Sequence, residues 1–166
     1  DLVGKYVNIA SRCAVFIQRK FGGKLGRAPG RFDFAAKAPE IAAHYDSREF
    51  GKALREVMAL ADVANQYVDE RKPWELSKQA GAEKELHEVC SSALELFRVL
   101  TLYLKPVLPK LAAQAERFLN LGELKWSDVA NPLPEGHRIN EYRHLLTRVE
   151  EKQLEQLFSQ PPKSAA

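Results

Sequence analysis

The chain has 166 residues, of which 45% are hydrophobic and 28% are charged, values that fit one globular domain and exclude a disordered or disulfide-dependent chain. The formal net charge of +3 excludes a highly basic nucleic-acid-binding protein. The charge is uneven, because residues 1–37 carry eight basic and two acidic side chains, whereas residues 38–166 carry 17 basic and 20 acidic ones. We therefore expect a polyanionic partner to bind near the N-terminal end, with moderate and salt-sensitive affinity.

The first predicted helix covers roughly residues 1–21. An α-helix advances about 100° per residue, so its apolar residues should face a core: Val3, Tyr6, Val7, Ala10, Cys13, Ala14, Ile17 and Phe21. Asn8, Arg12 and Arg19 fall on the other side. Such a row of amide and guanidinium groups can form directional hydrogen bonds to base edges or phosphates. The alternative is a solvated helix face.

An irregular loop is predicted from Gly22 to Phe34, because glycines and Pro29 interrupt the helical pattern. Lys24, Arg27 and Arg31 lie in this loop, next to the basic helix. They could contact a nucleic-acid backbone or be ordinary solvated side chains. The sequence leaves these two interpretations open.

Two helices are expected in the middle of the chain, the first a short one near residues 39–45. Ser47 is typical of an N-cap for a long amphipathic helix that reaches about Arg71. Pro73 ends that helix or begins the next one, because it fixes φ and lacks an N–H, and Trp74 follows it directly. The predicted core positions of the long helix are Phe50, Ala53, Leu54, Val57, Leu60, Ala61, Ala64, Tyr67 and Val68.

The remaining pattern predicts a helix over residues 82–105, a second from near Pro109 to about Asn120, a loop over 121–140 anchored by Trp126, and a last helix from about Arg148 to Phe158. No alternating β pattern of useful length occurs, so the fold class is all-α, in one domain over residues 1–166 with residues 121–166 packing back. The core side of the helix over 82–105 is predicted to be Leu86, Val89, Cys90, Ala93, Leu94, Phe97, Leu100 and Leu104.

Cellular context follows from what the sequence contains. Cys13 and Cys90 have no CxxC or Cys/His ligand spacing, and we interpret both as small core residues in a reducing compartment. Neither a signal peptide nor an apolar run of membrane-spanning length is present, which indicates a cytoplasmic protein without a membrane partner. The chain starts without Met and directly in helical periodicity, and we expect it to be part of a longer polypeptide.

Catalytic motifs are missing from this sequence. It has no GxxxxGK[ST] or GxGxxG phosphate loop, no HExxH and no GxSxG. Its histidines, which are His44, His87, His137 and His144, have no metal-ligand spacing. We therefore predict no catalytic residue, metal site or cofactor in this chain, and binding is the function that remains.

Four stretches together resemble one known family. They are residues 7–12 (VNIASR), 47–53 (SREFGKA), 62–74 (DVANQYVDERKPW) and 104–109 (LKPVLP). They closely resemble the anticodon-binding domain of methionyl-tRNA synthetase, and the resemblance covers nearly the whole chain. A Pro-Trp pair alone is shared with related class I synthetases, but together with the Asn-x-x-Ser-Arg element it is specific. Residues 22–34 match the family poorly.

This resemblance implies a helical bundle of the class I synthetase anticodon-binding type, following a Rossmann-type catalytic domain, that reads the CAU anticodon of methionine tRNAs. Asn8 and Arg12 would contact the first anticodon base, and Trp74, placed by Pro73, would stack on it. Arg19 would reach neighbouring bases or the backbone, a role that adjacent Lys20 could take instead. The implied partners are the anticodon stem-loop of tRNA(Met) and the catalytic domain of the same polypeptide, where ATP with magnesium would serve the ligation of methionine to tRNA. The HIGH-like and KMSKS-like motifs of that catalysis are absent from this chain.

The physical chemistry of single-stranded RNA recognition agrees with these roles. Bases stack on aromatic rings and are hydrogen-bonded at their Watson-Crick edges, and every base can stack, so selection must come from the hydrogen bonds. Two alternatives remain open at this level. One is the anticodon-binding domain of another class I synthetase, and the other is a helical protein-interaction module whose partner surface would include Val15 and Phe16.

Overall fold

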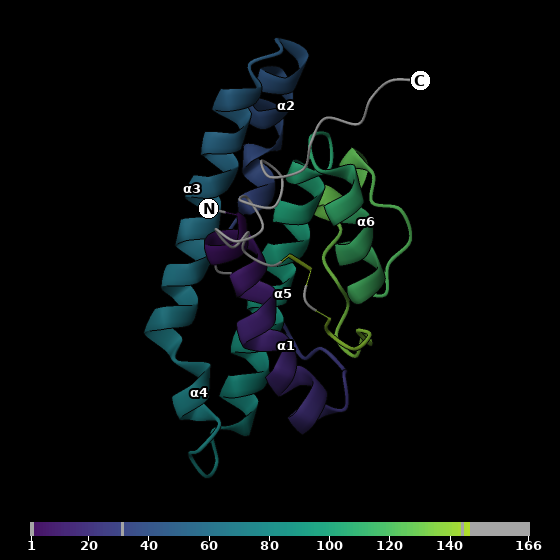
Figure 1. The fold of residues 1–166 in the computed structure, drawn as a ribbon. Helices are drawn as coiled ribbons and strands as arrows, with labels where there is room; N and C mark the ends of the chain where they lie inside the picture. The colour runs from purple at the N-terminus through teal and green to yellow at the C-terminus, as the bar shows by residue number, and fades with distance from the viewer. Residues whose placement is uncertain (1, 31, 144, 147–166) are drawn as a thin grey trace, which may run out of the picture.

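A computed structural model of the protein describes residues 2–30, 32–143 and 145–146. Within these residues there is no β-strand, only an isolated antiparallel bridge between Lys24 and Arg138, which confirms the all-α class. The elements in chain order are a π-helical turn Leu2–Val7, α1 Asn8–Phe21, a 3-10 helix Phe34–Lys37, α2 Ala38–Asp46, α3 Phe50–Arg71, α4 Pro73–Leu76, α5 Glu83–Leu104, α6 Pro109–Phe118 and a 3-10 helix Trp126–Ala130 (Figure 1).

Helix α5 is the central element, with α1 and α3 on one side of it and α6 on the other (Figure 1). Every residue from Val89 to Leu104 except Glu95 is buried. The sequence predicted one apolar side for this helix, and those positions are indeed buried. The helix is enclosed on its other sides as well, as expected for a helix with little polar surface. Its polar residues therefore lie inside the protein.

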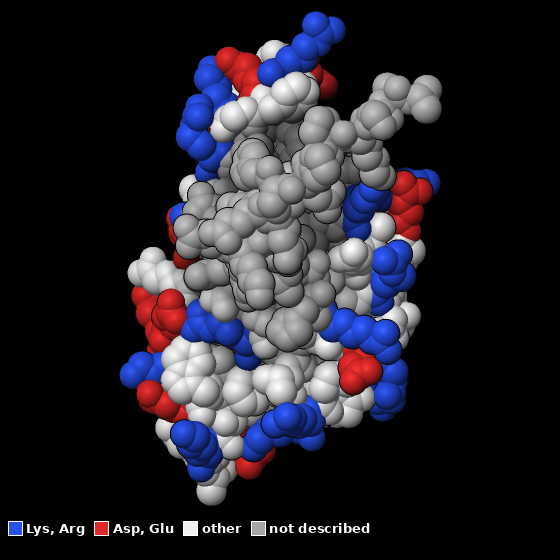
Figure 2. All heavy atoms as spheres, in the orientation of Figure 1, with Lys and Arg blue, Asp and Glu red and all other residues white. Residues whose placement is uncertain are grey.

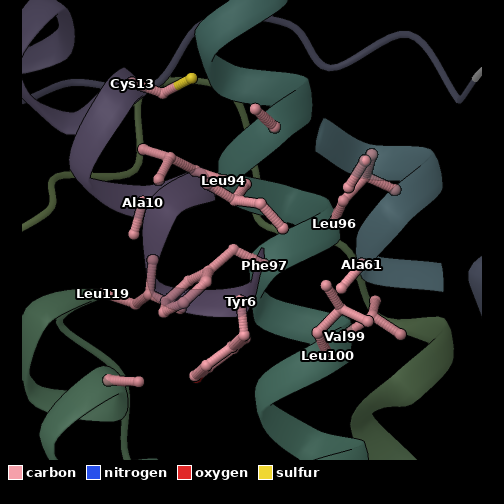
Figure 3. Close-up of a cluster of buried hydrophobic side chains, with 14 of the residues drawn as sticks. Tyr6, Ala10, Cys13, Ala61, Leu94, Leu96, Phe97, Val99, Leu100 and Leu119 are labelled. Carbon is pink, nitrogen blue, oxygen red and sulfur yellow. The ribbon is translucent and has the colours of Figure 1, made fainter. Parts of the chain in front are cut away.

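The predicted core side of the first helix is confirmed for Tyr6, Val7, Ala10, Cys13, Ala14 and Ile17, which are all buried. Tyr6 stacks on Phe97 of α5 with a ring-centroid distance of 4.6 Å (Figure 3). The Thr101 hydroxyl donates to the Phe97 carbonyl at 2.8 Å, so the Tyr6 phenol donates to Thr101 at 2.6 Å. Burial raises the pKa of Tyr6. This contact fixes the N-terminal turn against α5.

Both cysteines are buried and free, as predicted. The fold brings Cys13 of α1 next to Cys90 of α5, although they are far apart in the sequence. A hydrogen bond with Cys13 and burial raise the pKa of the Cys90 thiol, so it stays protonated. The pair therefore behaves as two small core side chains at the contact between α1 and α5.

The predicted start of the long helix is wrong. Ser47 does not cap α3 but ends α2, where its N–H donates to the Ala43 carbonyl at 3.0 Å. Arg48 follows with φ of 60°, which reverses the chain. Phe50 was predicted to be in the core, but it is 49% exposed because it begins α3 beside this reversal, at 6.2 Å from the Tyr45 ring.

A buried ion pair fastens the segment after α6 to the central helix. Arg98 is 1% exposed, and its Nη2 donates to the Glu95 carboxylate at 2.6 Å. The same guanidinium donates to the carbonyls of Asp128 at 2.8 Å and Val129 at 3.1 Å. Glu95 also accepts the Leu133 N–H at 3.0 Å. One pair on α5 thus satisfies backbone groups over residues 128–133.

Trp126 also holds this segment in place, as predicted for the loop over 121–140. Its ring lies 5.4 Å from the ring of Tyr103 and 6.4 Å from that of Tyr45. The helix predicted from about Arg148 to Phe158 lies outside the described residues, as do Arg31 and His144.

The loop after α1 packs closely on α5 through a glycine. A Cβ atom at Gly26 would lie 2.7 Å from Nδ1 of His87. The His87 ring stacks on Phe21 at 3.8 Å and donates through Nε2 to the Lys24 carbonyl at 2.8 Å. The Gly26 N–H donates to the hydroxyl of Ser91 at 2.8 Å. The absence of a side chain at residue 26 is therefore what allows this loop to lie against α5.

Replacing Arg98 with Met should lower the free energy of unfolding by about 3–5 kcal/mol, because Glu95 would keep a largely buried charge without its partner. Urea denaturation of the variant measures this. Lys37→Met, which breaks an exposed pair with Glu40, is the control and should leave the unfolding midpoint close to wild type. An Arg98→Met variant as stable as this control would contradict the role given to the ion pair.

Replacing Gly26 with Ala should destabilise the protein by about 1–3 kcal/mol, because the added methyl group collides with the His87 ring. Thermal unfolding of the variant and of Gly122→Ala, whose Cβ would meet open space, provides a matched comparison. In the His87→Ala background the cost of Gly26→Ala should largely disappear. If Gly26→Ala destabilises the His87→Ala protein as much as it destabilises wild type, the added methyl group does not collide with the His87 ring.

Candidate nucleic-acid interface

Helices α1 and α3 run side by side in the same direction (Figure 1), and their polar edges face each other. Lys5 pairs with Asp62 at 2.8 Å, and Arg12 pairs with Asp69. Between them Asn8 contacts Asn65. Each pair joins residues 57 apart in the sequence, so the register between the helices is constant. Of the side of the first helix that we predicted to be displayed, Asn8 and Arg12 are therefore half-buried against α3, whereas Arg19 is exposed.

Arg12 and Trp74 are brought together, as the sequence-based hypothesis requires. The guanidinium carbon of Arg12 lies 4.9 Å from the centroid of the Trp74 ring. The Trp74 side chain is half-buried, with its inner part against the core. The Arg12 side chain is 21% exposed. A cation over an indole face is a favourable contact, and Asp69 holds the same guanidinium from α3.

The backbone around Pro73 directs Trp74 towards Arg12 of α1. Lys72 has φ of 45°, in the left-handed region, and its N–H donates to Val68 at 2.9 Å, so it ends α3. Pro73 is buried and begins α4, where a missing N–H costs nothing. Together they turn the chain sharply between α3 and α4.

Lys20 of α1 contacts the C-terminal end of α4. Its ammonium group donates to the Ser77 carbonyl at 2.6 Å, and the Ser77 hydroxyl donates to the Trp74 carbonyl at 2.9 Å. Arg19 is exposed and makes no hydrogen bond or ion pair with any described residue. Of these two neighbouring cations, Lys20 is thus the one that contacts the tryptophan-bearing segment.

Asn8 keeps unused hydrogen-bonding capacity at this site. Asn65 donates its two amide hydrogens to the carbonyls of Lys5 and Ala61, each at 2.8 Å, so its oxygen faces Asn8. Asn8 donates to that oxygen at 3.3 Å. The side-chain oxygen of Asn8 has no donor among the residues described. It can therefore accept a hydrogen bond from a ligand.

Sequence reasoning missed the polar residues that α3 and the end of α4 contribute around the site, which are Asn65, Asp69 and Ser77, whereas it named Lys20 as a possible replacement for Arg19. A signal for two of them was present. Asp62, Asn65 and Asp69 are spaced i, i+3, i+7, and Lys5, Asn8 and Arg12 have the same spacing over the π-helical turn and α1. Two stripes with equal spacing and complementary groups favour a polar contact between two helices.

The arrangement suits a flat aromatic ligand with hydrogen-bonding edges. It combines an indole ring, a guanidinium group and a carboxamide with an open acceptor. The described residues contain no group of three His, Cys, Asp or Glu side chains that could hold a metal ion. None of the described helices is both long and apolar enough to cross a membrane.

Known proteins of one kind are similar to this chain. Methionine–tRNA ligase of Azoarcus sp. strain BH72 is 58% identical over 170 residues, which cover 100% of this chain and 24% of that protein. The enzyme of the same name from Aromatoleum aromaticum is 56% identical over 170 residues, with the same coverage. The chain thus spans about a quarter of the length of these curated relatives, at 24%.

Solved structures share the fold. The apo form of Mycobacterium tuberculosis methionyl-tRNA synthetase aligns with a TM-score of 0.81 and 19% identity, over 90% of this chain and 33% of that one. The same synthetase in complex with methionyl-adenylate aligns with a TM-score of 0.78 and 20% identity, over 89% of this chain and 31% of that one.

The family described as the anticodon binding domain of methionyl tRNA ligase matches residues 23–160 of this chain. This match covers most of the sequence and agrees with the relatives at more than half identity. The chain therefore belongs to the family of methionyl-tRNA ligase anticodon-binding domains.

Proposed function

We propose that this chain binds the CAU anticodon of methionine tRNAs, as the anticodon-binding part of an enzyme that attaches methionine to tRNA. The proposal rests on one contact above all, the Arg12 guanidinium 4.9 Å over the Trp74 ring beside Asn8. Catalysis, with ATP and magnesium, belongs to a catalytic domain elsewhere in the parent polypeptide. The partners are thus the anticodon stem-loop of tRNA(Met) and that domain.

In this proposal the first anticodon base stacks on Trp74 and takes the place of the Arg12 guanidinium on the ring. Arg12 then moves from the ring face to the edge of the base. The exchange costs little, because one contact to the indole is replaced by another of similar strength. Asp69 stays within reach of the guanidinium and limits how far it moves.

Hydrogen bonds at the edge of the base provide the selection. Cytosine presents the acceptors O2 and N3 beside an amino group, whereas N3 of uracil is a donor. The guanidinium of Arg12 can donate to the two acceptors, and the open side-chain oxygen of Asn8 can accept from the amino group. Uracil would leave at least one of these groups unsatisfied.

Pro73 and Arg19 have supporting roles in this proposal. Pro73 directs Trp74 outward from the end of α3, and exposed Arg19 contacts a neighbouring base or the backbone. The alternative of a protein-interaction module is less well supported, because Phe16, one of the two residues that would mark its surface, packs against the core. Family membership favours methionine over another class I synthetase.

Loss of the stacking ring should weaken RNA binding. Trp74→Leu keeps apolar contact with the core but removes the indole, and we expect the CAU stem-loop to bind about 1–3 kcal/mol more weakly. Fluorescence anisotropy with a labelled stem-loop measures this, and thermal unfolding verifies that the variant is folded. Trp126→Phe is the control, since Trp126 packs far from Arg12, and it should bind like wild type. Trp74→Phe keeps an aromatic ring, and its affinity should lie between those of Trp74→Leu and wild type. If wild type and the three variants bind the stem-loop equally, the base does not stack on Trp74.

Replacing the first anticodon base with uracil should weaken binding to the wild-type protein, because the acceptor and donor pattern no longer matches Asn8 and Arg12. Asn8→Ala and Arg12→Ala should each reduce the preference for CAU over UAU by about 1–3 kcal/mol. Competition between the two stem-loops gives this preference directly. If wild-type protein binds both loops equally, the methionine assignment is wrong. If the variants lose affinity but keep the preference, the two side chains do not read the base.

A further inference from the structure

An isolated antiparallel bridge brings together two basic residues that are distant in the sequence, Lys24 and Arg138. The loop after α1 pairs with residues 136–139 through backbone hydrogen bonds. The Leu25 N–H donates to the His137 carbonyl at 2.8 Å, and the Ile139 N–H donates to the Gly23 carbonyl at 2.8 Å. Lys24 and Arg138 lie between these bonds, directly opposite each other. Their side chains are therefore close neighbours on one face.

Two like charges at such a position repel each other, which destabilises a strand pair. Neither Lys24 nor Arg138 has an ion pair with any described residue, although Arg138 Nη1 donates to the Gly22 carbonyl at 3.0 Å. Acidic partners are common elsewhere in this chain, as at Lys5, Lys37 and Lys105. No described carboxylate therefore compensates the charges of Lys24 and Arg138.

Two more exposed cations, which are near Lys24 in the sequence, are likewise without an ionic partner among the described residues. Arg19 lies in the last turn of α1, and Arg27 lies in the loop that follows. We name Arg19, Lys24, Arg27 and Arg138 the basic strip. Figure 2 shows basic side chains spread across the lower part of the molecule, where α1 and α4 end.

The backbone of the basic strip is held in place before any ligand binds. The stacking of His87 on Phe21, its hydrogen bond to the Lys24 carbonyl and the bond from Gly26 to Ser91 fix the loop on α5. Lys20 of the same helix end bonds to the Ser77 carbonyl near Trp74. The backbone that carries Lys24 and Arg27 is therefore fixed on α5, directly after the end of α1 from which Lys20 contacts α4.

We propose that the basic strip binds backbone phosphates of the RNA stem-loop whose first anticodon base stacks on Trp74. This inference rests on the proposed function and adds a second, sequence-independent contact to it. Phosphates supply the negative charge that Lys24 and Arg138 lack, and binding them releases counterions. Base-reading groups and phosphate-binding groups are then separate parts of one RNA-binding surface.

The double variant Lys24→Gln/Arg138→Gln tests the inference. It should weaken binding of CAU and UAU stem-loops by the same factor, on the order of tenfold at low salt, and leave their ratio unchanged. The dependence of log K on log salt should become shallower by about 1–2. Trp74→Leu should instead reduce affinity without changing this slope.

Arg55→Gln/Lys110→Gln is the matched control. It removes the same charge from exposed positions in the first half of α3 and at the start of α6, and the slope should stay as in wild type. Equal losses in both double variants would overturn the inference, because only overall charge would then matter. A Lys24→Gln/Arg138→Gln variant with the wild-type affinity and salt dependence would also overturn the inference. The proposed function would still be supported in that case if the wild-type protein prefers CAU over UAU. Competition by polyglutamate as strong as that of the stem-loop would assign the basic strip to acidic proteins instead and overturn the inference as well.

Discussion

Helix α5 is enclosed by the rest of the bundle from Val89 to Leu104, and most of the polar side chains along this stretch have a partner inside the protein, the Ser92 hydroxyl being an exception among the described residues. These partners lie in different segments. Ser91 accepts from the loop after α1, Thr101 accepts from Tyr6 in the N-terminal turn, and Arg98 donates to carbonyls of the segment after α6. Buried groups without partners would cost about 1–3 kcal/mol each. The polar residues of α5 thereby determine where three otherwise irregular segments dock.

The candidate site depends on this arrangement, because α5 holds both helices that form it. With α1 and α3 fixed against α5, their contact has a constant register, and Arg12 is placed between the Asp69 carboxylate and the Trp74 indole. Without a ligand, the guanidinium covers the ring that a base would use. A cation–π contact and a stacked base are alternatives of similar strength. In the proposed function the site is thus preformed and exchanges an internal contact for a ligand.

The two parts of the proposed RNA-binding surface differ in how their charges are balanced. Arg12 and Lys5 have carboxylate partners on α3, so their charge is largely neutralised and they suit directional contacts. The cations of the basic strip lack such partners among the described residues, and they suit phosphates. Phosphate contacts raise affinity for any RNA, whereas contacts to base edges distinguish one sequence from another. A net charge of only +3 is compatible with the proposed RNA binding, because the cations without acidic partners among the described residues are those of the basic strip.

The sequence by itself determined the helical class, the core side of the first helix, the role of Trp126 as a packing anchor and the family to which the chain belongs. These features depend on periodicity and on short motifs, which are local properties. Tertiary structure alone decided that Ser47 ends a helix, that Phe50 is exposed, that Asn8 and Arg12 are paired with α3, and that Lys24 lies opposite Arg138. The physical reason is that a serine can end or begin a helix, and a polar helix face can meet water or another polar face equally well. Only the packing of distant segments removes that ambiguity.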